Sequence, residues 1–453
     1  MTAWKLIQNL VAHLQPNRQQ WIREIHSENR NRMIFELCAT ILLIGLILKM
    51  TKRPHNFPPG PRGLPLVGYL PFFSSWDPQY PHKAMKKISE VYGPVVGLYV
   101  GPSRPVISVC SHEAMKEAML NDDLNGRPDL AVMMARTFGE KLGERFQRHD
   151  SKFQELLRAN ELFFRTGKIF RGSMPVPAFL LKRFRFIREF IGVKAELIEP
   201  IQKFIKETIE DHQQRNPSDD EAGDFIDVYL KEMKKQKDEN PSTNFTEKQL
   251  ISTIIDLFGA GAESTSGSIG FAIIHLVRDQ QVQQKMQMEL DQVCGEFFPT
   301  INHRSSLPYT EAVLMEAQRC STIAPLTPPH YAIKDTKLQG YTIPQGSLVS
   351  LNLHAVFQDS KYWKDPEVFR PERHLNDDGS KVIKSDHFYP FGLGKRMCLG
   401  ESLAKNTYFL FTAALIKKFR FDPVPDEPLP SLDPTNGFTL GYQGFKAVVT
   451  PRS

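Results

Sequence analysis

The stretch Phe391-Gly392-Leu393-Gly394-Lys395-Arg396-Met397-Cys398-Leu399-Gly400 stands directly before a long apolar helical pattern, Glu401 to Phe419. Glycine lets a backbone turn tightly and approach a flat group closely. A helix N-terminus and a nearby arginine both favour the thiolate form of a cysteine. Cys398 is therefore a candidate ligand of a transition metal, because a thiolate is a soft anionic donor. The alternative is a buried structural cysteine in a strand-to-helix turn.

This pattern resembles the haem-thiolate signature of the cytochrome P-450 family, Phe-x-x-Gly-x-Arg-x-Cys-x-Gly. Every defined position is present: Phe391, Gly394, Arg396, Cys398 and Gly400. The resemblance implies a mainly α fold with a small β region. It also implies that Cys398 is the axial ligand of a haem iron, and that the other four residues hold the loop against the haem.

Composition is that of a globular protein, with 453 residues, 41% apolar, 24% charged and a net charge of +6. The five cysteines are widely spaced and form no Cys-x-x-Cys pair. This spacing argues against a disulfide framework and a zinc site, and favours a reducing compartment. The cations are scattered along the chain, so we expect a membrane surface or an acidic protein partner rather than a nucleic acid.

The N-terminal region predicts a membrane tether. Residues 1–32 form a polar extension, and residues 33–50 form an apolar stretch flanked by cations. That stretch is slightly shorter than the ~20 apolar residues of an ordinary spanning helix. Residues 51–65 are a proline-rich hinge to the body, residues 66–453. We expect one anchor with a cytoplasmic body, as in the microsomal members of the family on the endoplasmic reticulum. A buried core helix and a secretory signal peptide are the alternatives.

The longest helical pattern runs from Thr246 to Val277 and contains Gly259-Ala260-Gly261-Ala262-Glu263-Ser264-Thr265. Glycines inside a helix cost about 1 kcal/mol each relative to alanine, which is tolerated where another group approaches the backbone. An acid followed by hydroxyls can pass a proton through water. The segment resembles the oxygen-activation helix of the family, so Glu263, Ser264 and Thr265 are candidate catalytic residues. Ser264 replaces the usual threonine and lacks the methyl that fixes its rotamer. A helix-packing groove with a surface acid is the alternative.

A buried ionic brace is predicted from Glu316 and Arg319 on a helical pattern, Leu307 to Cys320, together with Arg373. Residues three apart share one face of a helix. Their order along the chain resembles the Glu-x-x-Arg and Pro-Glu-Arg brace of the family. A carboxylate shared by two guanidiniums would set the meander before the cysteine loop. His374 stands where the family usually has phenylalanine. Taken alone, Glu-x-x-Arg is more often a surface pair.

The resemblance also assigns contacts with the rest of the haem and with substrate. His330 and Arg396 are candidate partners of the haem propionates, and the alternative for His330 is a solvated side chain. Six residues are candidates for the substrate pocket: Phe258, Ala262, Ile323, Leu326, Phe438 and Leu440. Each of the six is equally compatible with plain core. Together they imply an apolar substrate, namely a lipid, a steroid, a terpenoid or a foreign compound.

Near residue 143 the sequence departs from the family pattern. Gly126-Arg127-Pro128-Asp129 resembles the segment ahead of a haem-contacting helix that carries Trp-x-x-x-Arg. No tryptophan lies between Trp76 and Trp363, so that motif has no counterpart. The chain instead continues into a segment that resembles a much later helix. We expect several helices to be absent here, as a skipped exon or an incomplete gene model would produce.

The function implied by the resemblance is monooxygenation. One oxygen atom from O2 would enter the apolar substrate, by hydroxylation or epoxidation, and the other would leave as water. Electrons would come from NADPH through a flavoprotein reductase, with cytochrome b5 as a further candidate partner. One alternative is an inactive or impaired variant that lacks part of its haem cradle. Another is an isomerase or dehydratase on the same fold, against which the acid–hydroxyl pair argues.

Overall fold

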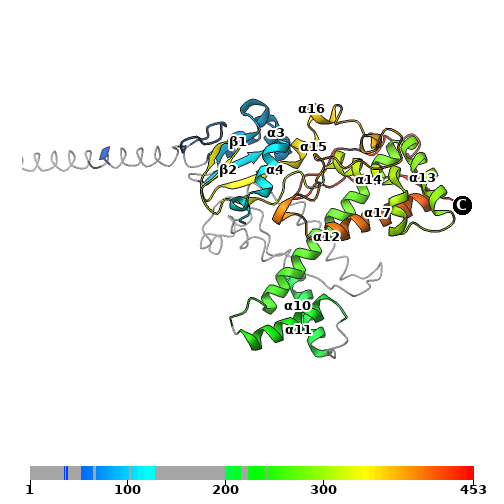
Figure 1. Cartoon of the computed structure of the whole chain (residues 1–453), viewed down its shortest axis with the longest axis horizontal. Coiled ribbons are helices and arrows are strands. Elements are labelled where there is room, and N and C mark those ends of the chain that lie inside the picture. Colours follow the sequence, from blue (N-terminus) through cyan, green and yellow to red (C-terminus); the bar gives the residue numbers. More distant parts are fainter. Residues whose placement is uncertain are drawn as a thin grey trace, which may run out of the picture.

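The computed structural model describes residues 35, 37–38, 53–64, 68–100, 104–127, 199–215, 223–240 and 242–452. Figure 1 shows a small sheet with its helices at one end of the molecule and a group of long helices at the other. Helices dominate and the β region is small, which confirms the predicted mainly α class.

The largest sheet has the strand order β1-β2-β6-β3. Strands β1 (Val95–Val100) and β2 (Arg104–Val109) form an antiparallel pair. Strand β6 (Leu348–Leu351) runs parallel to β2, and β3 (His330–Tyr331) closes the sheet antiparallel to β6. Because β2 and β6 are far apart in sequence, this pairing joins the N-terminal part of the chain to the part that precedes the cysteine loop.

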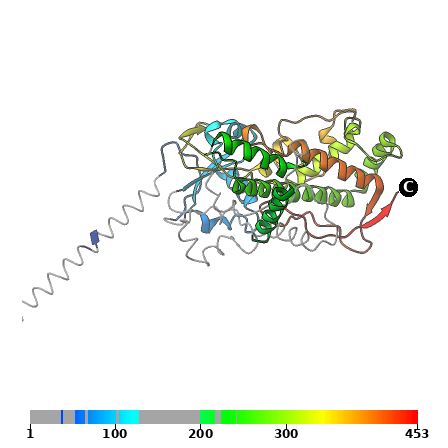
Figure 2. The ribbon, with the colours of Figure 1, turned by 90° about the horizontal axis from the view of Figure 1, so that it is seen from below.

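Four long helices form the other end of the molecule. They are α12 (Glu247–Arg278), α13 (Gln280–Cys294), α14 (Pro308–Ser321) and α17 (Glu401–Lys418). Asp279 ends α12 and caps α13, since its Oδ1 accepts hydrogen bonds from the backbone amides of Gln281 and Val282. Figure 2 shows α12 and α17 side by side through the middle of the molecule, where their buried apolar faces share one core.

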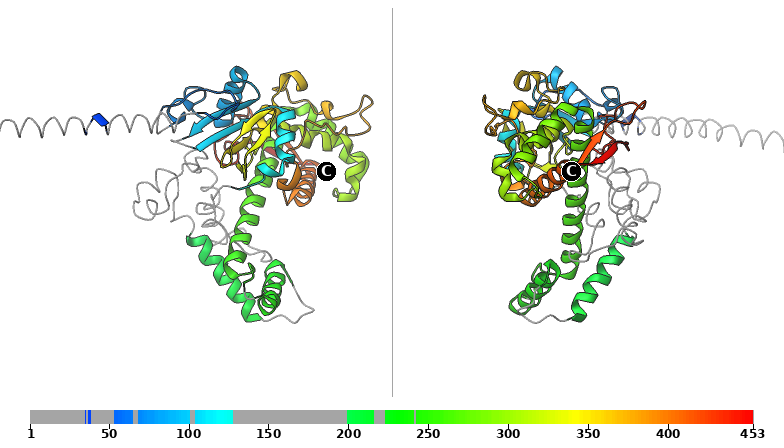
Figure 3. Two further views of the ribbon diagram at one scale, coloured as in Figure 1. Left: turned by 60° about the vertical axis from the view of Figure 1, so that its left-hand side comes forward. Right: turned by 90° about the vertical axis from the view of Figure 1, so that its right-hand side faces the viewer.

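Two further helices, α10 (Glu199–Arg215) and α11 (Phe225–Glu239), pack against the first half of α12. They share a core of apolar residues: Phe204, Ile205, Ile209, Ile226, Leu250, Ile254 and Ile255. Figure 3 shows this three-helix unit projecting from the rest of the molecule along α12.

Short elements connect these parts. On the sheet side they are α2 (Leu70–Phe73), α3 (Pro81–Tyr92), α4 (His112–Leu120), η1 (Asp122–Leu124), β4 (Thr336–Leu338), β5 (Tyr341–Ile343), α15 (Leu353–Phe357) and η5 (Gly394–Arg396). On the helical side they are η3 (Ile301–Ser306), α16 (Ser360–Trp363), η4 (Pro371–His374), β7 (Phe419–Asp422) and β8 (Val448–Pro451).

The described part of the proline-rich hinge lies against the sheet. The backbone amide of Gly97 in β1 donates to the carbonyl of Pro59 at 2.8 Å. Arg53 donates to the carbonyls of Gly60 and Pro61. The middle of the predicted hinge is therefore packed on the body of the protein.

Within the described residues, no helix combines the length and the apolar character that crossing a membrane requires. The predicted extension, residues 1–32, lies outside the described residues. So does the predicted anchor, residues 33–50, apart from the exposed Phe35, Leu37 and Cys38. The predicted break near residue 143 also lies outside them.

Candidate functional site

The cysteine loop is shaped by two glycines in the left-handed region, Gly392 with φ 77° and Gly394 with φ 68°. A Cβ on Gly394 would lie 2.5 Å from the carbonyl oxygen of Met119, so no larger residue fits without a shift of the backbone. The amide of Cys398 donates to the carbonyl of Phe391 at 2.8 Å and closes the loop. Cys398 is exposed and stands just before the N-terminus of α17, as the sequence pattern predicts.

The two cations of the loop tie it to the segment after α4. Lys395 forms an ion pair with Asp122 at 2.7 Å. The Nε of Arg396 donates to the carbonyl of Asn125 at 2.8 Å. These contacts fix the orientation of the loop, because two of the three residues of η5 are held by partners more than 250 residues earlier in the chain.

Two positively charged arginines, Arg127 and Arg396, form a cationic cluster beside the loop together with the buried His330, which is neutral at pH 7. Arg127 donates to the carbonyls of Pro328 and Pro329, and the Nδ1 of His330 donates to the carbonyl of Leu124 at 3.0 Å.

The electrostatics of this cluster favour an anion. Desolvation, with the charge of Arg396, lowers the pKa of Arg127 to about 10. Burial, with the charge of Arg127, lowers the pKa of His330 to about 4. His330 is only 3% exposed, so the alternative of a solvated histidine is wrong. Arg127 was not among the predicted site residues, although it lies in the segment Gly126-Arg127-Pro128-Asp129, which resembles part of the family pattern.

The glycine-rich part of α12 is regular helix, and its small residues play different roles. A Cβ on Gly267 or Gly270 would press into Ile323 or Tyr442, so these two glycines permit close packing. Gly261, in contrast, is exposed, and a Cβ there would meet nothing within 4 Å. The hydroxyl of Ser264 donates to the carbonyl of Ala260 at 2.6 Å. The helix therefore leaves open space beside Gly261, next to the predicted acid–hydroxyl residues.

The predicted brace is assembled around the fully buried Glu316. Its Oε2 accepts from the Nε of Arg319 and its Oε1 from the Nε of Arg373, both at 2.8 Å. The amide of Arg370 and the Nε2 of His374 add two donors at 3.0 Å. Burial alone would raise the pKa of Glu316, but the hydrogen bonds from Arg319 and His374 hold that pKa well below its usual range. The surface-pair alternative is thus wrong, because the Arg319 side chain is fully buried as well.

The six predicted pocket residues divide between two places. The amide of Leu440 donates to the carbonyl of Ile323 at 2.7 Å, which joins the C-terminal segment to the chain after α14. Leu326 and Leu440 are buried, whereas Phe258, Ala262 and Ile323 are half-buried. Phe438 packs on the core of α10, α11 and α12.

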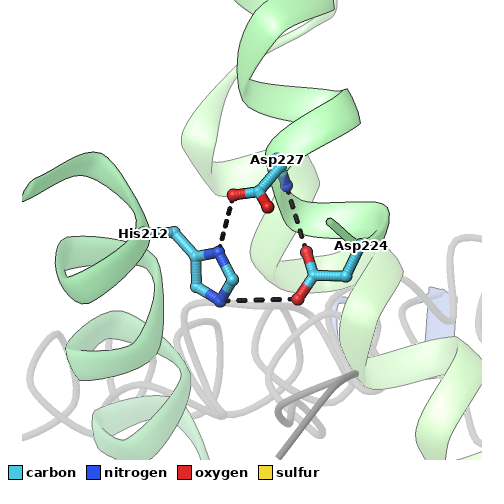
Figure 4. Close-up of side chains that lie close together, drawn as sticks. All are labelled: His212, Asp224 and Asp227. Carbon is cyan, nitrogen blue, oxygen red and sulfur yellow. Dashed lines mark hydrogen bonds and ion pairs between the residues drawn. The ribbon is translucent and has the colours of Figure 1, made fainter. Parts of the chain in front are cut away.

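A second polar cluster, which the sequence did not reveal, joins α10 to α11 (Figure 4). The Nδ1 of His212 lies 2.7 Å from Asp227, and its Nε2 lies 3.5 Å from Asp224. A metal ion binds along the lone pair of one ring nitrogen, but here the two carboxylates face different nitrogens. The arrangement is a bridge between helices rather than a set of converging metal ligands. The sequence feature that could have indicated this cluster is Asp224, which caps the N-terminus of α11.

The residues around Cys398 fit a flat, apolar and anionic group such as haem. The loop presents an exposed thiol, and the neighbouring Leu399 and Leu403 are 90% and 73% exposed although both are apolar. The cationic cluster adjoins them through Arg396, and the hydrogen bonds described for its members go to backbone carbonyls. Apolar side chains open to solvent suit a ligand with an apolar body, and two arginines that form no ion pair within the described residues suit its carboxylate edges.

Comparison with known proteins agrees with this site. Residues 58–141 and 130–449 match the family described as cytochrome P-450. Cytochrome P-450 2J3 of Rattus norvegicus is 32% identical over 93% of this chain and 96% of its own length. Farnesoate epoxidase of Bombyx mori is 29% identical, over 92% of this chain and 99% of its own. Cytochrome P-450 18a1 of Drosophila melanogaster is 28% identical, over 96% and 94%.

These comparisons also show that this chain lacks positions that a relative has. The two family matches overlap over residues 130–141. The alignment with the rat relative spans 497 positions, whereas this chain has 453 residues, so at least 44 positions (497 less 453) have no counterpart here.

Proposed function

This chain belongs to the cytochrome P-450 family of monooxygenases, and on that premise we propose that it inserts one oxygen atom from O2 into an apolar substrate. The reaction would be a hydroxylation or an epoxidation. The observation that carries the proposal is the exposed Cys398 on a glycine-shaped loop, with a cationic cluster beside it. A cysteine with only a structural role would be expected to lie in the core.

Haem, when bound, supplies the iron at which oxygen is activated. Cys398 would provide its thiolate ligand, and Arg127 and Arg396, with the predicted partner His330, would hold its propionates. Phe391, Gly394 and Gly400 complete the signature: Phe391 fixes the cysteine amide, and Gly394 lets the loop lie against α4. The brace of Glu316, Arg319 and Arg373 would position the loop rather than take part in the chemistry.

Glu263, Ser264 and Thr265 would deliver protons from the side of α12. The Ser264 hydroxyl donates its proton to the Ala260 carbonyl, so its oxygen lone pairs remain free to accept from a water molecule. Glu263 is half-buried one residue earlier and is able to exchange protons with that water. Without the methyl of threonine, the Ser264 hydroxyl rotates more freely, so we expect proton delivery to be less tightly coupled to substrate oxidation.

The remaining parts of the proposal concern substrate, partners and place. The half-buried Phe258, Ala262 and Ile323 would meet an apolar substrate, together with Leu326, Phe438 and Leu440. A lipid, steroid, terpenoid or foreign compound fits this lining. Electrons would come from NADPH through a reductase, with cytochrome b5 as a further partner. Residues 33–50 would anchor the chain in the endoplasmic reticulum membrane with its body on the cytoplasmic side.

A second candidate is a catalytically impaired variant of such an enzyme. It is favoured by the 44 or more unmatched positions, by the two family matches that overlap over residues 130–141, and by the absence of any tryptophan between Trp76 and Trp363. Such a chain would keep the cysteine loop but lack part of the wall around the haem.

One experiment separates the two candidates. The chain is expressed with a haem supply, reduced under carbon monoxide, and its difference spectrum recorded. A thiolate-type Soret band supports the monooxygenase, and Cys398→Ala should abolish it. Cys38→Ser, at an exposed cysteine far from the loop in sequence, is the control and should leave the band unchanged. If no thiolate-type band forms with the unaltered chain, the impaired variant is the correct reading.

A further inference from the structure

His374 occupies an unusual position inside the brace. Its side chain is fully buried, and its Nε2 lies 3.0 Å from the Oε2 of Glu316. The imidazole ring centroid lies 5.8 Å from that of Trp363 and 5.3 Å from that of Phe388. The sequence pattern marked this residue only as a departure from the phenylalanine that is usual in the family.

The two ring nitrogens have different surroundings. A carboxylate can only accept, so Nε2 must carry the proton that it shares with Glu316. Nδ1 is buried and has no hydrogen-bond partner among the residues that the structure describes. A ring that was present for packing alone would gain from losing this unpaired nitrogen, because burying an unpaired polar atom is unfavourable. The hydrogen bond to Glu316 is therefore what favours histidine at this position.

Both the backbone and the ring of His374 contact the segment that leads to the cysteine. The carbonyl of His374 accepts from the amide of Ile383 at 2.8 Å. Phe388, against its ring, stands three residues before Phe391, whose carbonyl accepts from the Cys398 amide. His374 thus contacts both the buried carboxylate of the brace and the meander that leads to the cysteine.

We propose that His374 is a positioning residue for the Cys398 loop, acting through the hydrogen bond from its Nε2 to Glu316. The hydrogen bond holds the imidazole in one orientation, and the imidazole in turn holds Phe388 and the start of the loop. This role adds to the proposed function, on which its biological meaning rests, but the contact itself is a property of the chain without haem.

The test is amide hydrogen exchange in the chain without haem, resolved at Cys398. His374→Phe keeps a ring and removes the donor. His374→Gln keeps a donor, because its Nε2 is at the same distance along the side chain as the imidazole Nε2. We expect His374→Phe to speed exchange of the Cys398 amide by roughly tenfold, since a hydrogen bond to a charged group contributes on the order of 1.5 kcal/mol. His374→Gln should restore most of the protection.

His82→Phe is the matched control, because His82 is also buried with an unpaired ring nitrogen but lies in α3, outside the brace. With the amides of α13 as the internal reference, His82→Phe should leave the exchange rate of the Cys398 amide unchanged. Wild-type exchange at Cys398 in His374→Phe overturns the proposal. If that variant does not fold, His374→Gln decides, and fast exchange in it overturns the proposal. A missing Soret band would count against the proposed function alone, because the exchange measurement needs no haem.

Discussion

Gly394 is restricted to glycine both by its backbone conformation and by its surroundings. Its φ is 68°, and a Cβ would meet the backbone oxygen of Met119 at 2.5 Å. Gly400, in the same motif, has φ −90°, and a Cβ there would meet nothing within 4 Å. Two glycines of one signature are therefore needed for different reasons. Gly394 allows the turn of the loop and its close packing on α4, whereas Gly400 leaves room for a group beside it.

Gly394→Ala should lower the free energy of unfolding by about 1–3 kcal/mol, because a residue with a Cβ is strained at this φ and presses on the α4 backbone. Gly400→Ala should change it by less than about 0.5 kcal/mol. Urea denaturation of the chain without haem measures both. Equal destabilisation by the two variants would contradict this assignment of roles.

The buried His275 is expected to make the folded chain less stable at acidic pH. Burial lowers the pKa of His275 to about 4, although the negative charge of Glu316 opposes the shift. The unfolded chain binds this proton near pH 6.5 and the folded chain only near pH 4, so stability is lost as the pH falls through that window. Between pH 6.5 and pH 4, His275 should lower the free energy of unfolding by roughly 1.4 kcal/mol for each pH unit. His275→Phe should remove this contribution. Urea denaturation at pH 7 and pH 5 tests it, with the exposed His55→Gln as a control that keeps the wild-type slope.

Among the secondary-structure elements, α10 and α11 are joined by the bridge that His212 makes. Its loss would leave Asp224 and Asp227 close together without the group that separates them. His212→Leu should destabilise this unit by about 1–3 kcal/mol, seen as faster amide exchange in α10 and α11 with α13 unchanged. Lys203→Ala, in an exposed pair with Glu207, should have little effect. Added Zn²⁺ should not raise the melting temperature, and a zinc-dependent rise would show that the cluster does bind metal.

Elements that depend on local pattern were predictable from the sequence. The pattern from Thr246 to Val277 became α12, Glu247–Arg278, and the pattern from Leu307 to Cys320 became α14, Pro308–Ser321. The His212 bridge and the His374 hydrogen bond were not predictable, since each joins side chains whose proximity only tertiary packing creates. The role of Arg127 was missed for a related reason. Its neighbours His330 and Arg396 come from distant parts of the chain.

At the scale of the whole molecule, α17 combines apolar side chains on most of its surface with incomplete burial. Phe411 is 60% exposed, although a helix that is apolar all round is normally buried. It lies about 15 Å along the helix from Glu401 at 1.5 Å per residue, so it is remote from the cysteine loop. The rat relative carries at least 44 positions that this chain lacks, counted as 497 less 453. We therefore expect that residues absent from this chain cover Phe411 in its relatives.

Restoring the unmatched segment of the rat relative at residue 143 should increase the haem bound per chain and raise the melting temperature. Phe411→Ser then reports whether the helix face has been covered. In the natural chain this change should be nearly neutral, because the ring already contacts water. In the restored chain it should lower the free energy of unfolding by about 2–4 kcal/mol, as loss of a buried aromatic ring does. Equal haem content before and after restoration would mean that the natural chain already holds a complete haem cradle, and a neutral Phe411→Ser in both would place the missing residues elsewhere.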